Sequence, residues 1–373
     1  MGAVQSLRDR MPAMVDLLSR LVNSESPSAS PDLVRSCLEV LAGAGTELLG
    51  SAPEWLEGDG RHHLLWRSNA PVRVLILMHL DTVWPVGTVD RWPFRVDGAT
   101  ATGPGVFDMK AGAVQGLFAA ASLPDKRGVA ILATSDEEIG SPSSRPLIET
   151  EARGARAVLV LEPSLDGALK VARKGVASYR VRVEGRAAHA SAPELGINAT
   201  VEAAARLLEA ARLSDGALGT TVTPTTIAGG TVTNTVPGET VFSLDVRART
   251  RAELDRVDEA LRSIQAVSSG ARITVEPSSE PRLPMEPSAS ASLFALAQAT
   301  AAGLGLEPLR GVHAPGGSDG NLTAALGVPT LDGLGAVGAG MHAEGERVLL
   351  AAMPERAALV AGILEALLLP GRK

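Results

Sequence analysis

The feature that most constrains the fold is the segment from Val72 to Asp81, which reads Val-Arg-Val-Leu-Ile-Leu-Met-His-Leu-Asp. Its apolar run lacks polar alternation, which is typical of a strand buried on both faces of a parallel sheet. The side chains of His79 and Asp81 share one face, because residues two apart in a strand point the same way. Ligands of open α/β sheets gather at the carboxyl ends of strands. Two interpretations follow: a solvated strand end, or a metal-ligating imidazole oriented by a carboxylate.

Composition and charge exclude several functional classes. The net charge of −7 argues against nucleic acids or anionic membranes as partners, since both need basic patches. Cys37 is the single cysteine, so the chain has no intrachain disulfide and no cysteine zinc site, and its apolar helical surroundings indicate a core position. The N-terminus is charged where a signal peptide is apolar, and no segment is long and uncharged enough to span a bilayer. We therefore expect a cytoplasmic protein without nucleic-acid or membrane partners.

Strands and helices alternate along the first half of the chain. Apolar residues recur at helical spacing over 4–22, and the patterns that follow predict helices at 32–44 and 109–122 and strands ending at 79, 134 and 161. Such alternation is typical of a mostly parallel sheet flanked by helices, an α/β fold.

The pattern changes near Lys174. The segments that follow are predicted as β-α-β-β-α-β, the order of a ferredoxin-like α+β unit, at 176–183, 198–212, 220–233, 239–249, 251–267 and 272–275. A proline-rich exit then returns the chain to the first domain, with helices near 291–303 and 354–369. The predicted domains are therefore 1–174 with 281–373, and an inserted domain at 175–280.

Acidic residues and a second histidine follow further apolar runs. Asp108 directly precedes a helix, where it could instead be an N-cap. Asp136, Glu137 and Glu138 directly follow the strand that ends at Thr134, where packed carboxylates repel one another unless a cation is present, although a solvated turn is the alternative. Two more candidates complete the set, Glu162 after an apolar run and His342 in a glycine-rich loop.

This nitrogen and oxygen donor set suits Zn²⁺, or Co²⁺ or Mn²⁺ in its place. Two ions about 3.5–4 Å apart, bridged by a carboxylate, polarise a carbonyl group and produce hydroxide near neutral pH. One of the paired glutamates would then be a general base while its neighbour binds metal.

Five motifs together resemble a known family. They are Met-His-Leu-Asp-Thr-Val, Gly-Pro-Gly-Val-Phe-Asp-Met-Lys-Ala-Gly, Ser-Asp-Glu-Glu-Ile-Gly-Ser, Leu-Glu-Pro and a late Met-His. In this order and spacing they resemble the di-zinc metallopeptidase family of glutamate carboxypeptidases, aminoacylases, acetylornithine deacetylases and succinyl-diaminopimelate desuccinylases. The glutamate carboxypeptidase branch is the most similar. The resemblance covers nearly the whole chain and implies a zinc exopeptidase-like catalytic domain with an inserted lid and dimerisation domain.

The resemblance implies two Zn²⁺ ions per chain and a role for each motif residue. Asp108 would bridge the ions, with His79 and Glu162 completing one site and Glu138 and His342 the other. Asp81 would orient His79, and Glu137 would be the general base acting on a metal-bridging hydroxide. A cis peptide bond is expected after the bridging residue, between Asp108 and Met109.

The same resemblance implies that further residues contact the substrate. His189 would reach the partner subunit's active site and stabilise the tetrahedral oxyanion. Asn234 and Arg247 would meet the oxyanion or a substrate carboxylate, which arginine can bind bidentately. Gly317 and Ser318, in the loop 316–320, would supply backbone N–H donors. His313 receives no role, and His62 and His63 are expected at the surface.

The preferred hypothesis is a homodimeric metal-dependent hydrolase that cleaves an amide next to a free carboxylate. Its substrate would be a small peptide or an N-acyl amino acid, and it would release a C-terminal amino acid, with glutamate among the candidates. An N-acyl-amino-acid deacylase and a dipeptidase on the same fold are the alternatives. A non-catalytic binding protein of the same fold would show gaps among the ligands, and the sequence has none. A nucleotide-binding protein would carry a glycine-rich phosphate-binding motif, which this sequence lacks. Hinge closure between the two domains is also expected.

Overall fold

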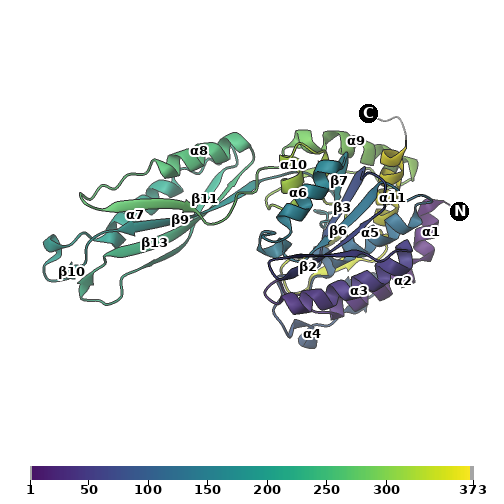
Figure 1. The fold of residues 1–373 in the computed structure, drawn as a ribbon, viewed down its shortest axis with the longest axis horizontal. Helices are drawn as coiled ribbons and strands as arrows, with labels where there is room; N and C mark the ends of the chain where they lie inside the picture. The colour runs from purple at the N-terminus through teal and green to yellow at the C-terminus, as the bar shows by residue number, and fades with distance from the viewer. Residues whose placement is uncertain (1, 370–373) are drawn as a thin grey trace. The chain divides into compact units, whose positions relative to one another are not determined.

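The structure, a computed structural model, describes residues 2–369 and divides into two compact units. The first unit comprises Met1–Ala172, Pro287–Ala314 and Ser318–Lys373, and the second comprises Arg173–Glu286 with Pro315–Gly317. Figure 1 shows the elements of both units along the chain. Each unit has its own hydrophobic core, so each is described separately below.

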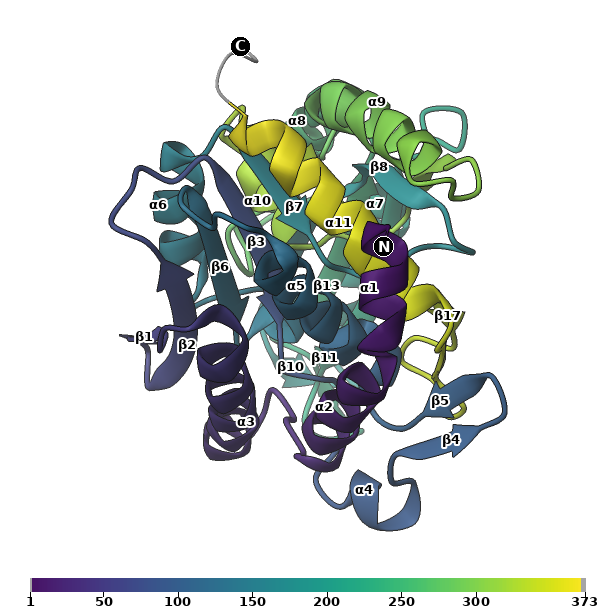
Figure 2. The same ribbon diagram turned by 90° about the vertical axis from the view of Figure 1, so that its right-hand side faces the viewer.

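A six-stranded mixed sheet forms the centre of the first unit, in the order β1-β2-β6-β3-β7-β16 (Figure 2). Its strands are β1 (Glu54–Gly58), β2 (Arg61–Arg67), β3 (Val74–His79), β6 (Val129–Thr134), β7 (Ala157–Val160) and β16 (Thr330–Leu331). β3 pairs in parallel with both β6 and β7, and β16 runs parallel to β7, whereas β1 and β2 are antiparallel additions. The α/β prediction is confirmed, and every residue of β3 is buried, as the unbroken apolar run predicted.

Helices cover both faces of this sheet, and alternate residues of β3 enter different cores. Val74, Ile76 and Met78 join the core beneath one group of helices, whereas Leu75 and Leu77 face the other group. The first group is α2 (Met11–Asn23), α3 (Pro31–Leu49), α5 (Ala111–Ser122) and α11 (Ala352–Leu368); the second is α6 (Arg145–Gly154) and α10 (Asp319–Ala325).

Helix α5 packs close to the sheet because it carries glycine where it contacts Leu161, the residue that follows β7. A Cβ atom at Gly112 would lie 2.2 Å from the backbone oxygen of Leu161, and one at Gly116 would lie 2.3 Å from the Leu161 side chain. Real Cβ atoms do not approach other atoms so closely, so these two glycines permit the contact. This packing places the residues that precede α5 beside the carboxyl end of β7.

The N-terminal helix predicted over 4–22 is two helices, α1 (Ala3–Asp9) and α2, which meet at Arg10. Pro12 lies in the first turn of α2, and a proline there has no N–H group to continue the preceding helix. Cys37 is fully buried in the core, as expected.

One long helix and several short elements complete the first unit. They are α4 (Thr88–Arg91), β4 (Arg95–Asp97), β5 (Thr100–Thr102), β8 (Leu169–Arg173), α9 (Pro287–Gly303), β15 (Gly311–Ala314), β17 (Gly338–Ala339) and β18 (Arg347–Leu349). Four of them form a small separate sheet in the order β17-β18-β5-β4. No helix within residues 2–369 is long and apolar enough to cross a membrane.

The second unit is an antiparallel sheet with the order β11-β13-β9-β14, accompanied by two helices. Its elements are β9 (Gly175–Glu184), β10 (Ala188–His189), α7 (Ala199–Ala211), β11 (Thr221–Gly229), β12 (Thr235–Val236), β13 (Glu239–Ala248), α8 (Arg251–Arg262) and β14 (Arg272–Pro277). The β-α-β-β-α-β chain order and the pairing of the first and third long strands are those of a ferredoxin-like unit. Along β13, buried and half-exposed residues alternate, as expected for a sheet covered on one face.

Candidate metal centre

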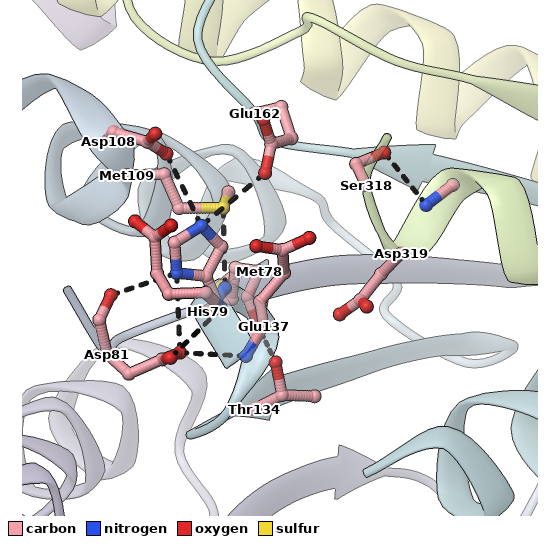
Figure 3. A network of polar contacts seen from close by, with 12 residues as sticks. Met78, His79, Asp81, Asp108, Met109, Thr134, Glu137, Glu162, Ser318 and Asp319 are labelled. Carbon is pink, nitrogen blue, oxygen red and sulfur yellow. Dashed lines mark hydrogen bonds and ion pairs between the residues drawn. The ribbon is translucent and has the colours of Figure 1, made fainter. Parts of the chain in front are cut away.

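His79 is the last residue of β3, and its imidazole is oriented by its own strand. Nδ1 donates a hydrogen bond to the backbone carbonyl of Asp81 at 3.0 Å, so the other ring nitrogen, Nε2, is left without a proton in the neutral ring. That nitrogen faces Asp108 and Glu162 (Figure 3). The strand therefore presents a nitrogen that could bind a metal ion at the carboxyl end of the sheet.

The two carboxylate oxygens of Asp108 face two different groups of donor atoms. Oδ1 lies 3.3 Å from His79 Nε2, and Glu162 Oε1 lies 3.4 Å from the same nitrogen. Oδ2 lies 3.2 Å from His342 Nε2, which is 3.3 Å from Glu138 Oε1. The structure thus brings together all five predicted ligands around one shared carboxylate.

These separations fit divalent metal ions better than they fit hydrogen bonds. Two ligand atoms about 2.0–2.1 Å from a tetrahedral Zn²⁺ ion lie about 3.3 Å from each other. In addition, His79 Nε2, Asp108 Oδ1 and Glu138 Oε1 are buried and have no hydrogen-bond partner. Buried polar atoms without partners are costly, and a cation between them would remove that cost. The residues present therefore fit a metal site.

Asp108 reaches this position from a distorted turn, Val106–Lys110, that precedes α5. It is not an N-cap, because the cap position of α5 is Lys110 and no side chain accepts a hydrogen bond there. The peptide bond between Asp108 and Met109 is cis, as the resemblance implied. The close packing of α5 at Gly112 places this turn against the end of β7, directly before Glu162.

The three consecutive acids after β6 separate into different roles. Asp136 turns away from the site and accepts hydrogen bonds from the backbone and hydroxyl groups of Ser143 and Ser144. Glu137 faces the site, with one carboxylate oxygen within 4.8 Å of ligand atoms of His79 and Glu162. Glu138 lies beside His342. Only two of the three carboxylates therefore belong to the cluster.

Asp81 supports the site mainly through the backbone of these glutamates. Its carboxylate accepts hydrogen bonds from the N–H groups of Glu137 and Glu138, both at 3.1 Å, and from the hydroxyl of Ser28 at 2.7 Å. The distance from its Oδ1 to His79 Nδ1 is longer, 3.5 Å. Asp81 thus links the end of β3 to the turn that carries both glutamates.

The crowded ionisable groups shift one another's pKa values. Burial raises the pKa of the Glu138 carboxyl to about 7. The adjacent carboxylates of Asp108 and Glu138 raise the pKa of the His342 imidazole to about 10. Burial disfavours a charged His79 ring, but the carboxylates of Asp108, Asp81 and Glu162 outweigh it and raise the pKa of that ring. The cluster therefore attracts positive charge, either protons or a metal ion.

The predicted oxyanion residues lie together on the second unit. β10 pairs with β12, so His189 is opposite Thr235, and the N–H of Ala190 donates to the carbonyl of Asn234 at 2.9 Å. The backbone N–H of Ser191 donates to His189 Nδ1 at 3.2 Å. Because Nδ1 is an acceptor, a neutral ring carries its proton on Nε2, which can donate to an oxyanion.

Arg247 lies near the opposite end of β13 from these residues. Its guanidinium group, with a side chain 40% exposed, pairs with Asp245 at 2.9 Å. Burial first, and then the charges of Arg249 and Arg247, lower the pKa of the nearby Lys174. Several cationic groups therefore gather at this end of the sheet.

The two predicted loop residues fall in different units. Gly317 belongs to the second unit, and its carbonyl accepts a hydrogen bond from Arg173. Ser318 is buried at the start of α10, where its N–H donates to Asn321 and its hydroxyl donates to Asp332. Both polar groups of Ser318 are thus engaged in capping the helix.

Of the remaining histidines, the surface prediction for His63 is wrong. His63 is fully buried in β2, and its ring nitrogens lie 3.1 and 3.4 Å from the hydroxyls of Ser143 and Ser135. His62 is partly exposed beside Arg35, and His313 is exposed on β15, outside the cluster.

The fold and the donor set define a metal-dependent hydrolase of the exopeptidase type. The chain belongs to peptidase family M20/M25/M40, whose pattern matches residues 75–366. This confirms the family resemblance inferred from the motifs and shows that the protein is a member of a metallopeptidase family.

Curated relatives and solved structures agree with this membership. The chain is 31% identical to carboxypeptidase G2 of Pseudomonas sp. (strain RS-16), over 96% of this chain and 90% of the relative. It is 30% identical to a succinyl-diaminopimelate desuccinylase of Thioalkalivibrio sulfidiphilus, over 78% of this chain and 82% of that one. The fold is similar to an M20 family metallo-carboxypeptidase from Sulfolobus solfataricus, with a TM-score of 0.73, 18% identity, and coverage of 95% and 99%.

Proposed function

We propose that this protein is a dinuclear metal-dependent carboxypeptidase that hydrolyses an amide bond next to a free carboxylate and releases a C-terminal amino acid. The observation that carries the proposal is the placement of the two Asp108 oxygens, one facing His79 and the other facing His342. The similarity to carboxypeptidase G2 along almost the whole chain supports the type of substrate.

In this proposal two Zn²⁺ ions, or Co²⁺ or Mn²⁺ in their place, bind at the cluster. His79, Asp108 and Glu162 hold one ion, and Asp108, Glu138 and His342 hold the other. Divalent ions supply a Lewis acid for the scissile carbonyl and lower the pKa of the attacking water. Asp108 is the one residue shared by both sites, so both ions depend on it.

Glu137 is the proposed general base. Its carboxylate takes a proton from the attacking water and then delivers that proton to the nitrogen of the leaving amine. Asp81 fixes the backbone of Glu137 through the N–H bond at 3.1 Å, which holds the base at the cluster.

His189 and Asn234 are proposed to stabilise the oxyanion of the tetrahedral intermediate. The N–H donated by Ser191 to Nδ1 of His189 keeps the proton of a neutral ring on Nε2, the atom that would face the oxyanion. Gly317 is proposed to contact the carboxylate end of the substrate through its backbone N–H. Ser318, predicted for the same task, gives its own N–H to Asn321 and is proposed to support that loop instead.

Arg247 is proposed to bind the free carboxylate of the substrate. A guanidinium group binds a carboxylate with two parallel hydrogen bonds, and in this structure Asp245 occupies the same donors. The cationic groups of Lys174 and Arg249 nearby would favour an anionic substrate at this end of β13.

We further propose that the active unit is a homodimer formed through the second unit, because one chain cannot bring its own oxyanion residues to its own Arg247. Eight residues of β13 separate Glu239, next to the β12 turn, from Arg247, which corresponds to about 27 Å at 3.4 Å per residue. A dipeptide spans only about 7 Å. A single substrate can meet both groups only if one of them comes from the partner subunit, and we propose that His189 and Asn234 do.

The exposed edge of the second unit supports this assembly. β11 is the outer strand of its sheet, and most of its residues are exposed. Val201 and Leu208 of α7 are 65% and 59% exposed. An open strand edge and exposed apolar side chains are features that pairing with a second copy would cover. Hinge closure and a cytoplasmic location stay predictions.

A substrate panel tests the proposed reaction. Metal-loaded protein is incubated with peptides, folate-like conjugates and N-acyl amino acids, each in a free-acid and a C-terminal amide form. The proposal expects hydrolysis of free acids and a large loss of kcat/KM with the amides. Equal rates on both forms would contradict it. The second candidate, an N-acyl-amino-acid deacylase, is favoured by the desuccinylase relative and expects N-succinyl or N-acetyl amino acids as the best substrates.

A further inference from the structure

Glu346 is a buried glutamate outside the proposed ligand set, and its carboxylate accepts four N–H hydrogen bonds. Oε1 accepts from the backbone of Phe107 at 2.7 Å and of Asp108 at 2.9 Å. Oε2 accepts from the backbone of Gly105 at 3.1 Å and from the indole N–H of Trp84 at 3.0 Å. Both oxygens are thus fully used by donors from two other segments.

The donors belong to the turn that carries Asp108. Residues 105–108 precede α5, so the N–H groups of Phe107 and Asp108 have no partner inside that helix. Glu346 supplies the missing acceptors. Without them, the turn would lose the contacts that fix the Asp108 backbone.

Glu346 also lies four residues after His342, at the end of the loop that carries this second imidazole. Its own N–H donates to the carbonyl of Ala343 at 3.1 Å, and its carbonyl accepts from the hydroxyl of Thr102 at 2.8 Å. The loop is therefore anchored at Glu346, while His342 itself is exposed. One side chain ties together two segments 238 residues apart in the sequence.

We propose that Glu346 is a positioning residue that sets the separation between Asp108 and His342 and so determines the affinity of the ion held by Asp108, Glu138 and His342. It touches no reacting atom and acts only through the two ligands. This inference rests on the proposed metal centre. The ion held by His79 and Glu162 depends on Glu346 less, because those two ligands come from β3 and from the end of β7.

The test variant is Glu346→Gln, which keeps the size of the side chain. A glutamine amide nitrogen cannot accept a hydrogen bond, so two of the four donors lose their partner. A gentler variant, Trp84→Phe, removes one donor and leaves Glu346 in place. The matched control is Glu202→Gln in the second unit, since Glu202 is also buried and accepts N–H bonds from Val267 and Ser268, both at 2.9 Å.

The full chain is freed of metal and titrated with Zn²⁺ in the presence of a competing chelator, at a temperature well below the melting temperature of each variant. In a second measurement, the absorption spectrum of the Co²⁺ form is recorded. For E346Q we expect one of the two binding steps to lose about 10–100-fold in affinity while the other changes less, with a changed Co²⁺ spectrum. For W84F we expect the same binding step to lose roughly 3–10-fold in affinity, because this variant removes one hydrogen bond to Glu346. E202Q should bind like the wild type.

Unchanged Zn²⁺ affinity and an unchanged Co²⁺ spectrum in E346Q would overturn the inference, even if its melting temperature falls. If E346Q does not fold, W84F with wild-type affinity would overturn it equally. A wild-type protein that binds no metal would instead contradict the proposed metal centre, so the two failures are distinguishable.

Discussion

Among the individual residues, those of the proposed metal centre must release protons before they can bind an ion. Glu138, with a pKa of about 7, and His342, with a pKa of about 10, hold protons at acidic pH in the metal-free protein. Metal ligands bind in their deprotonated forms, so an ion has to displace these protons.

We therefore predict that Zn²⁺ affinity rises with pH. From about pH 6 to 8 Glu138 loses its proton, and above that range His342 continues to titrate, toward about pH 10. His79, whose pKa is also raised, adds to the proton release. Chelator-competition titrations at several pH values, with proton release measured in parallel, would detect this. An affinity independent of pH, with no protons released, would contradict the assignment of these two ligands.

A second prediction at this scale concerns Glu137. The substitution Glu137→Gln should leave both ions bound but lower kcat by about 10²–10⁴-fold, because the amide cannot accept the proton of the attacking water. Metal analysis and steady-state kinetics are measured together. Glu149→Gln, which changes an ion-paired glutamate on α6, is the control and should remain active. Activity of E137Q within tenfold of the wild type would argue against a general base at this position.

At the scale of elements, the site depends on where the central strands end. β3, β6 and β7 are parallel neighbours, so His79, the Glu137–Glu138 turn and Glu162 emerge at one edge of the sheet. Asp108 joins them because α5 packs close to the sheet at Gly112. The proposed metal centre thus depends on strand order and on one close helix contact.

The sequence predicted the elements whose pattern is local. The apolar runs of β3, β6 and β7 each predict a buried strand, and the acidic residues after β6 and β7 indicate the candidate metal centre. The burial of His63 was missed, because its partners Ser143 and Ser135 come from segments more than 70 residues away. Glu346 was missed for the same reason. The small sheet of β17, β18, β5 and β4 has strands too short to carry a pattern.

A prediction at the scale of elements compares two arginines of the same sheet. Arg247→Ala should lower kcat/KM for free-acid substrates by roughly 10–100-fold, mainly through KM, and should affect C-terminal amides much less. Arg182→Ala is the matched control, since Arg182 on β9 is 46% exposed and also pairs with a carboxylate. Steady-state kinetics on paired free-acid and C-terminal amide substrates measure whether each arginine selects the carboxylate. An equal loss on both substrate forms would show that Arg247 does not select the carboxylate.

For the whole molecule, each proposed active site needs two subunits. His189 and Arg247 of one chain lie toward opposite ends of the second unit, so a complete site would combine residues of both protomers. The two units of each chain would then have separate tasks: the first would hold the metal ions, and the second would supply substrate contacts across the dimer.

Complementation between inactive variants tests this arrangement. H189A and E137Q should each be inactive alone, whereas their co-expressed mixture should recover up to about a quarter of wild-type activity, because half of the dimers are mixed and each mixed dimer has one complete site. The recovered rate is compared with that of E137Q mixed with E137Q,H189A, which should stay inactive. No recovery despite mixed dimers would mean that His189 serves its own chain or no site.

The most direct test of the central claim is the metal content of the purified protein after reconstitution with Zn²⁺ and removal of excess metal. We expect two ions per chain in the wild type and less than one in Asp108→Ala, since both proposed sites share that carboxylate. A wild type holding fewer than one ion per chain, or a D108A variant that still holds two, would contradict it.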